Sequence, residues 1–238
     1  MLKAVLFDLD GTLLPMEESE FIQQYGELLG IKMSKLGLDG NKLGKLIWKS
    51  MDLMNLSDGS KSNDEIFDQT FITFYGDEAK KYKDILLDYY ANEFSGTKNI
   101  CKDNPLAKLI VSFVKENNLL CILATNPVYP KIATINRMNF IGLNESDFDM
   151  VTYHENSRYT KSNPNYYKDL LTKFNLKPEE VILFGNNTYE DGESSLECNI
   201  KTFLIDGYII FDKKAKHNFD IIKMEDVIPT IKNYIENI

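Results

Sequence analysis

Two aspartates, Asp8 and Asp10, directly follow a short apolar run near the N-terminus, in the stretch Ala4-Val5-Leu6-Phe7-Asp8-Leu9-Asp10-Gly11-Thr12-Leu13. A run rich in Val, Leu and Phe before a glycine turn predicts a buried strand, so both carboxylates are expected where that strand leaves the core. Strand side chains alternate with a period of two, which places the pair on one face. Two like charges at that spacing are costly unless a cation or a shared proton compensates them. The pair therefore predicts a hard metal ion such as Mg²⁺, although solvated acids in a turn would give the same pattern.

Polar residues also follow the later apolar runs. The run Leu119–Ala124 leads into Thr125 and Asn126, which would be simple turn residues if they stood alone. Lys161 stands just before a predicted helix whose first position is Pro164. A lysine is unfavourable near a helix N-terminus, so we expect its ammonium to compensate clustered carboxylates and to attract a phosphate.

The run Val181–Phe184 leads into a glycine turn followed by amides and acids, with the sequence Gly185-Asn186-Asn187-Thr188-Tyr189-Glu190-Asp191. Acids in the first turn of a helix are common because of the helix dipole alone. Because this turn is expected opposite Asp8 and Asp10, metal binding is the favoured interpretation for its acids.

The elements that position these residues alternate between strand and helix from residue 104 onward, with Lys201–Ile205 as the last predicted strand. This alternation predicts an α/β fold, a Rossmann-like parallel sheet covered by helices on both faces. Ligands of such sheets bind beyond the carboxyl ends of the strands, where the polar residues above are expected. The predicted helices of this part are Pro105–Asn117, Pro130–Met138, Pro164–Phe174, Glu190–Glu197 and Glu225–Ile235, and a further short strand is predicted at Met150–Tyr153.

A block without a convincing strand separates the first strand from this alternating part. Its apolar spacing predicts helices over Glu17–Leu36, Asn41–Met54, Asn63–Tyr75 and Glu78–Phe94. A connection of that length is typical of an inserted module or lid. We therefore predict a catalytic core of residues 1–15 plus 97–238 and an all-helical cap domain of residues 16–96. Trp48, Lys45 and Lys49 share one predicted cap helix and could reach the site, although a Trp is more common in a core and lysines on a solvated face.

Composition narrows the class of protein. The 238 residues carry a formal net charge of −9, which argues against a nucleic-acid or acidic-membrane partner, so an anionic substrate needs a local positive site. The three cysteines have no metal-ligand spacing, and together with the lack of a secretory or membrane-spanning run they predict a cytoplasmic protein. Nothing in the sequence indicates the oligomeric state.

Taken in order, Asp8-x-Asp10-Gly11-Thr12, Thr125, Lys161 and the turn Gly185–Asp191 resemble the haloacid dehalogenase-like hydrolase superfamily over the predicted core. The resemblance implies that Asp8 attacks phosphorus and that Asp10 acts as general acid and then as general base. It also implies that Thr125 and Lys161 hold the phosphoryl oxygens, and we add Asn126 as a substrate-binding residue. The helical block then resembles the cap of this family, which closes over the site.

The function that follows is an Mg²⁺-dependent phosphatase acting on a small phosphorylated metabolite, because dehalogenases of this family lack the acid at the position of Asp10. One departure concerns the fourth motif, which usually has an Asp after the glycine turn, where this chain has Asn186 and Asn187. An amide oxygen can bind Mg²⁺ but brings no charge, so Asp191 or Glu190 would have to complete the site. The predicted metal ligands are Asp8, Asp10, Asn186, Asn187 and Asp191. Two alternatives stay open, a catalytically silent phosphate-binding or regulatory protein and a phosphotransferase or mutase.

Overall fold

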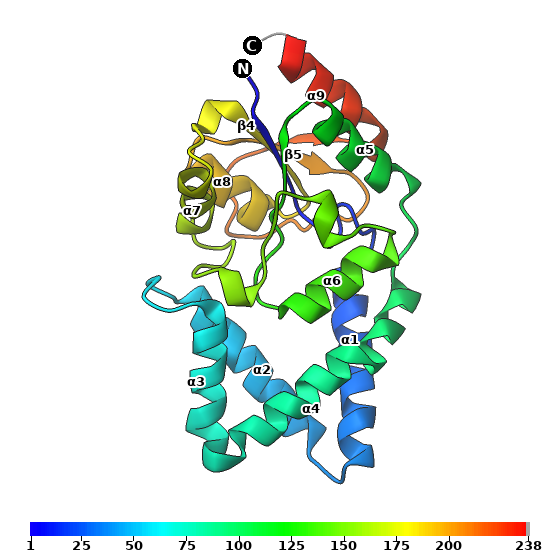
Figure 1. Cartoon of the computed structure of the whole chain (residues 1–238), viewed down its shortest axis with the longest axis vertical. Coiled ribbons are helices and arrows are strands. Elements are labelled where there is room, and N and C mark those ends of the chain that lie inside the picture. Colours follow the sequence, from blue (N-terminus) through cyan, green and yellow to red (C-terminus); the bar gives the residue numbers. More distant parts are fainter. Residues whose placement is uncertain (237–238) are drawn as a thin grey trace.

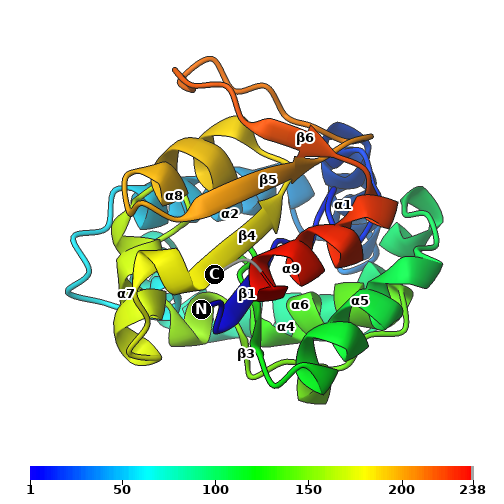
Figure 2. The ribbon, with the colours of Figure 1, turned by 90° about the horizontal axis from the view of Figure 1, so that it is seen from above.

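The computed structural model describes residues 1–236, and its centre is a six-stranded parallel sheet with the strand order β3-β2-β1-β4-β5-β6 (Figure 2). This confirms the predicted α/β fold. The strands are β1 Ala4–Phe7, β2 Leu120–Leu123, β3 Met150–Val151, β4 Val181–Gly185, β5 Lys201–Ile205 and β6 Asp220–Ile222. The chain adds β2 and β3 on one side of β1 and then β4 to β6 on the other, so the strand order switches at β1. A ligand site is expected at the carboxyl end of that strand.

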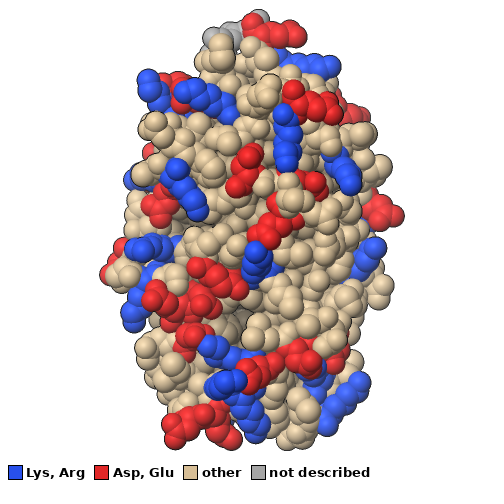
Figure 3. Space-filling view, in the orientation of Figure 1, with Lys and Arg blue, Asp and Glu red and all other residues tan. Residues whose placement is uncertain are grey.

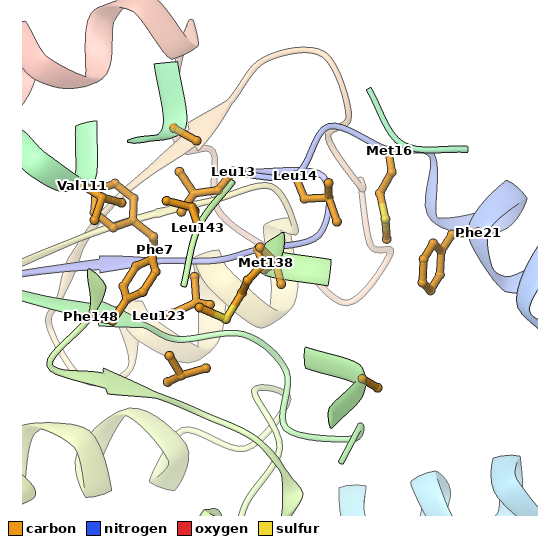
Figure 4. Packing of buried hydrophobic residues seen from close by; sticks show 14 of the residues in the cluster. Phe7, Leu13, Leu14, Met16, Phe21, Val111, Leu123, Met138, Leu143 and Phe148 are labelled. Atoms are coloured by element: carbon orange, nitrogen blue, oxygen red, sulfur yellow. The ribbon is translucent and has the colours of Figure 1, made fainter. Parts of the chain in front are cut away.

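Strand β1 is buried on both faces, which explains its uninterrupted apolar sequence. Val5 and Phe7 belong to the larger hydrophobic core, and Phe7 lies among Val111, Leu143 and Phe148 (Figure 4). The alternate residues Ala4 and Leu6 belong to a second cluster with residues of the helix that begins at Asn165. Asp8 continues the alternation of this second face, so its side chain leaves the sheet on the side of that helix.

Helices cover both faces of the sheet, with α7 Asn165–Lys173 and α8 Ser194–Leu196 on one side and α5 Pro105–Glu116 and α9 Val227–Glu236 on the other (Figure 2). A further helix, α6 Lys131–Phe140, follows the loop that leaves β2. Helix α5 begins with Asn104 as its N-cap, whose side chain accepts a hydrogen bond from the Leu106 amide.

The connection between β1 and α5 holds four helices, which lie together beyond the carboxyl ends of the strands (Figure 1). Their bounds are α1 Glu18–Lys35, α2 Gly40–Asn55, α3 Asn63–Tyr75 and α4 Ala79–Ala91. Local signals fix the start of two of them. Asp39 caps α2 by accepting from the Lys42 amide, and Ser62 forms a capping box with Glu65 at the start of α3. We propose that this helical module acts as the cap predicted for residues 16–96.

Several predicted elements differ from the structure. Lys201–Ile205 is not the last strand, because β6 pairs parallel with it; β6 has only three residues and none of them is buried. The helix predicted over Glu190–Glu197 is a π-helical turn, Thr188–Glu193, followed by the short α8. The Gly192 amide donates to the Asn187 carbonyl in this turn, a spacing of five residues that periodicity analysis does not anticipate. Pro164 is the N-cap of α7 rather than its first residue.

The surface mixes charges of both signs. On the face shown in Figure 3, Lys and Arg side chains alternate with acidic ones, and no broad basic patch stands out. Within residues 1–236, no helix combines the length and the apolar character that crossing a membrane requires. Cys101, Cys121 and Cys198 are free thiols.

Candidate active site

Asp8 is the first residue beyond β1, and its carboxylate is buried. Its backbone amide donates to the Phe184 carbonyl of β4 at 2.8 Å, which fixes the main chain at the end of the strand. Its Oδ1 lies 2.6 Å from the Lys161 ammonium, and its Oδ2 accepts a hydrogen bond from Thr12 Oγ1 at 3.3 Å. Burial raises the pKa of Asp8 to about 7, helped by the charges of Asp191 and Asp10 and opposed by Lys161. The adjacent Lys161 cation therefore favours the ionised form of the predicted nucleophile and opposes the effect of burial.

Gly11 makes the turn that places Asp10 beside Asp8. It has a φ of 77°, a conformation that favours glycine, and its amide donates to the Leu14 carbonyl at 2.8 Å. A Cβ at this position would stand 2.1 Å from Nδ2 of Asn186. Only glycine therefore lets the loop after β1 pack directly against the loop after β4.

Lys161 joins these two loops through its ammonium, which is almost completely buried. One side of the ammonium pairs with Asp8, and the other pairs with Asp191. Burial opposes the charge of Lys161, but the charges of Asp191 and Asp8 outweigh it and raise the pKa above the ordinary value. Lys161 therefore stays protonated and supplies the local positive charge that an acidic protein needs to hold an anionic substrate.

Asp191 organises the turn after β4. Its Oδ2 accepts from the amides of Asn186 and Asn187 at 3.0 and 2.9 Å, and its Oδ1 pairs with Lys161. It also accepts a hydrogen bond from the Tyr167 hydroxyl at 3.4 Å. The structure thus places Asp191 beside Asp8 and Lys161, with its carboxylate contacting the lysine, the Tyr167 hydroxyl and two main-chain amides.

The side chains of the two asparagines in the same turn have different hydrogen-bond partners. Asn187 Oδ1 accepts from the amides of Tyr189 and Glu190 at 2.9 and 3.1 Å and so caps the π-helical turn. Asn186 donates through Nδ2 to the Tyr208 carbonyl at 2.8 Å, which leaves its Oδ1 as the atom that it can offer to a ligand. The main-chain amides of both residues donate to Asp191, which places this turn at the Asp8, Lys161 and Asp191 network.

Thr125 and Asn126 lie at the end of β2, next to this network. The buried Thr125 has its backbone carbonyl fixed by the hydroxyls of Thr152 and Tyr166. Asn126 Nδ2 donates to both carboxylate oxygens of Glu190 at 3.0 Å, and its Oδ1 accepts from the Lys161 amide at 3.3 Å. Asn126 therefore ties the β2 loop to the segments that carry Lys161 and Asp191.

Asp10 has a partner that the sequence analysis did not find. Its Oδ2 forms an ion pair with Arg137 of α6, and its Oδ1 is buried and has no hydrogen-bond partner among the described residues. The Arg137 guanidinium lies over the Tyr129 ring, with 4.4 Å between Cζ and the ring centroid. The sequence contains one signal that could have drawn attention to Arg137. Arginine is rare in this lysine-rich chain, which has only two, Arg137 and Arg158.

A cavity of about 410 Å³ lies between α1 and α2 and reaches Tyr129. Trp48 and Lys45 line it, and the absence of side chains at Gly26 and Gly44 leaves space there. Lys49, which the sequence grouped with them, lines a different cavity between α2 and α3. Trp48 is half exposed rather than part of the core, contrary to the commoner role of tryptophan.

Comparison with known proteins identifies the family of this chain. The family model of haloacid dehalogenase-like hydrolases matches residues 2–194. A curated relative, the phosphorylated carbohydrates phosphatase of Thermotoga maritima, is 27% identical over 125 residues, which are 51% of this chain and 54% of that relative. The chain thus aligns with about half the length of this relative.

Solved structures show the same fold at low identity. A HAD phosphatase from Thermococcus onnurineus superposes with a TM-score of 0.58 and 16% identity, covering 97% of this chain and 98% of that one. The L-2-haloacid dehalogenase of Xanthobacter autotrophicus superposes with a TM-score of 0.55 and 12% identity, covering 98% and 99%. The fold therefore occurs with both chemistries, and the site residues must decide between them. From the match over most of its length, this chain belongs to the haloacid dehalogenase-like hydrolase family.

Proposed function

We propose that this protein hydrolyses small phosphomonoesters, with Asp8 as the nucleophile. The observation that carries the proposal is the buried Asp8 carboxylate at the carboxyl end of β1, with the Lys161 ammonium 2.6 Å from it. An ammonium at that place can bind phosphoryl oxygens while it keeps the attacking carboxylate ionised. The name of the curated relative, a phosphatase of phosphorylated carbohydrates, supports a phosphorylated sugar or similar metabolite as the substrate.

The proposed reaction has two steps on residues of this chain. In the first, an Asp8 oxygen bonds to phosphorus, the bond to the ester oxygen breaks, and Asp10 gives that oxygen a proton. In the second, Asp10 takes a proton from a water molecule that attacks phosphorus, which releases phosphate and restores the Asp8 carboxylate. Thr125 and Lys161 hold the phosphoryl oxygens in both steps, because transfer depends mainly on positioning and on neutralised charge.

The oxygen donors around Asp8 fit Mg²⁺ in kind. Asp8 supplies a buried carboxylate, and the turn after β4 supplies the side-chain oxygens of Asn186 and Asn187, of which the Asn187 oxygen already accepts from two main-chain amides. In residues 1–236, however, no group of three or more His, Cys, Asp and Glu side chains is arranged to hold a metal. We propose that Asp8 binds Mg²⁺ together with these side-chain oxygens, while Asp10 keeps Oδ1 for proton transfer and Asp191 supports the site through Lys161. Bound Mg²⁺ would reduce the repulsion between the Asp8 carboxylate and the phosphate.

In this proposal, the leaving group binds in the cavity lined by Trp48, Lys45 and Tyr129. Tyr129 connects the cavity to Asp10, since its ring lies on the guanidinium that pairs with Asp10. A volume of about 410 Å³ is in the range of small-molecule pockets, and an aromatic wall with one lysine suits a polar ring. The cap helices α1 and α2 would therefore select the substrate.

The test is hydrolysis of p-nitrophenyl phosphate by wild type, Asp8→Asn and the control Asp206→Asn, each with Mg²⁺ and with EDTA. Asp206 is an exposed acid after β5, outside the site. We expect Mg²⁺-dependent turnover in wild type and in the control, and a loss of several orders of magnitude in Asp8→Asn. Equal turnover by wild type and Asp8→Asn would contradict the proposal. An inactive wild type that binds phosphate would favour the silent alternative, and a stable phosphoenzyme consumed only by an added sugar phosphate would favour a mutase.

A further inference from the structure

The environment of Arg137 points to a single task for this residue. Its side chain is completely buried, and its hydrogen bonds within its own helix go to the Ala133 carbonyl and Thr134 Oγ1, at 3.4 and 3.3 Å. Within residues 1–236, Asp10 is the only acidic side chain in ion-pair contact with the guanidinium. A buried guanidinium without a carboxylate partner is strongly destabilising, so the two side chains hold each other in place.

The choice of arginine at this position is informative. The chain carries 27 lysines and arginines, of which only Arg137 and Arg158 are arginines. Arg158 is exposed and donates to the Gly59 carbonyl. A guanidinium differs from an ammonium in its planar set of donors and its ability to stack on an aromatic face, and Arg137 uses both properties, with Asp10 and with Tyr129. The site therefore requires a fixed direction of the donor as well as a positive charge.

The ion pair between Arg137 and Asp10 gives the two carboxylate oxygens of Asp10 different surroundings. Oδ2 is held by Arg137, whereas Oδ1 is buried and has no partner among the described residues. Arg137 does not line the cavity between α1 and α2, because Tyr129 lines that cavity and lies on the guanidinium. The arginine is thus placed to act on Asp10, and a leaving group in the cavity would meet the tyrosine ring instead of the cation.

We infer that Arg137 is a positioning residue that fixes the Asp10 carboxylate by Oδ2 and so directs Oδ1 to the oxygen of the leaving group. The inference rests on the proposed phosphatase function and adds a residue to it. If it is correct, loss of Arg137 impairs proton transfer to the leaving group more than it impairs attack by Asp8.

Two substrates separate these effects. The p-nitrophenolate ion leaves without protonation, whereas the alkoxide released from an alkyl phosphate such as glycerol 2-phosphate needs a proton from Asp10. We compare single-turnover release of the leaving group in wild type, Arg137→Met, Arg137→Lys and the control Arg158→Met, with Mg²⁺ present. We expect Arg137→Met to lose at least about tenfold more rate with the alkyl phosphate than with p-nitrophenyl phosphate, within the range known for general acids. Arg137→Lys should recover part of this difference, and the control should match wild type.

A double-mutant cycle with Asp10→Asn keeps the test decisive if Arg137→Met folds poorly. The double variant Asp10→Asn/Arg137→Met contains neither buried charge, so it avoids the unpaired carboxylate of the single variant. If Arg137 acts through Asp10, the double variant should show the same ratio of rates for the two substrates as Asp10→Asn alone.

Three results would overturn the inference while leaving the phosphatase function intact in an active wild type. The first is an equal loss of rate for both substrates in Arg137→Met. The second is a higher KM with unchanged kcat in that variant, which would mean that Arg137 contacts the substrate directly. The third is a ratio of rates for the two substrates that differs between Asp10→Asn/Arg137→Met and Asp10→Asn. A wild type that hydrolyses neither substrate would instead overturn the proposed function, and the inference with it.

Discussion

The ammonium of Lys161 lies 2.6 Å from Asp8 Oδ1 and also pairs with Asp191, so one buried cation connects the ends of two neighbouring strands. Asp8 follows β1, and Asp191 belongs to the turn after β4. Each carboxylate alone would be costly at this depth, and the shared lysine makes the arrangement stable. The same group can bind a phosphate, which links the stability of the site to its proposed chemistry.

Replacement of Lys161 by Met should therefore reduce stability as well as activity. Two buried carboxylates would lose their cation, and breaking a buried ion pair on one side costs about 3–5 kcal/mol in the free energy of unfolding. Urea unfolding measures this cost, with the exposed Lys168→Met as a control that should stay within about 0.5 kcal/mol of wild type. An Lys161→Met protein as stable as the control would contradict the role assigned to the lysine.

The two asparagines after Gly185, Asn186 and Asn187, allow a matched pair of Asn→Asp variants. Asn187→Asp keeps an oxygen to cap the amides of Tyr189 and Glu190 and adds a negative charge to the proposed metal site. We expect it to lower the Mg²⁺ concentration needed for half-maximal activity by about tenfold, because added ligand charge raises affinity for hard cations.

Asn186→Asp should behave differently, since it removes the hydrogen bond from Nδ2 to the Tyr208 carbonyl and places a carboxylate near that oxygen. We expect a loss of about 1–3 kcal/mol in the free energy of unfolding. Magnesium titrations of activity, combined with urea unfolding, compare the pair. Identical behaviour of the two variants would refute the different roles that their contacts indicate.

The cap cavity leads to a prediction about the substrate. Trp48→Ala should raise KM severalfold for phosphorylated sugars and leave kcat with p-nitrophenyl phosphate nearly unchanged, because Trp48 lines the cavity proposed for the leaving group and has no role in the proposed chemical steps. Lys49→Ala is the matched control, one residue further along the same helix and lining another cavity. Steady-state kinetics with both substrate types decide the matter, and equal KM changes in the two variants would speak against the cavity as the leaving-group site.

Sequence reasoning found the part of the site that lies at strand ends. Asp8, Thr125, Lys161 and Asp191 follow apolar runs or precede a helix, and parallel strands bring such positions to one edge. The parallel sheet was predicted from the alternation of strands and helices, and the helical module was predicted after the first strand because the block that follows shows helical spacing without a strand.

Residues contributed from other places were not predicted. Arg137 lies inside α6, where an arginine at a helical spacing is indistinguishable from a surface residue until the tertiary packing is known. The partners of Asn187 depend on a π-helical turn, which no periodic pattern predicts. Strand β6 was missed because its three residues form a sheet edge without a buried apolar pattern.

We expect His154 to make the stability of the protein sensitive to acid. It is buried against Phe67 of α3, with Asp64, Glu155 and Lys83 as the charged neighbours, and burial lowers its pKa to about 3. A histidine whose pKa is depressed by folding contributes stability above its unfolded pKa of about 6.5, and that stability is lost as the pH falls. Wild type should therefore lose up to about 1.4 kcal/mol per pH unit more than His154→Gln between pH 6 and pH 4.

Measurements of wild type and His154→Gln at pH 8 provide the control. His154 is neutral there in both the folded and the unfolded state, so the difference in the free energy of unfolding reports the packing cost of the substitution alone. Urea unfolding at several pH values gives the comparison. A difference between the two proteins that does not change with pH would show that His154 is not held neutral by the fold.

The central claim, attack by Asp8, is tested most directly by trapping the phosphorylated carboxylate. Wild type is mixed with substrate and Mg²⁺, quenched, and treated with borohydride, which reduces an acyl phosphate to the alcohol; peptide mass spectrometry then locates the change. We expect homoserine in place of Asp8, and an unmodified Asp8 in protein incubated without substrate. Modification at any other residue, or rapid hydrolysis of substrate with Asp8 never modified, would contradict the account.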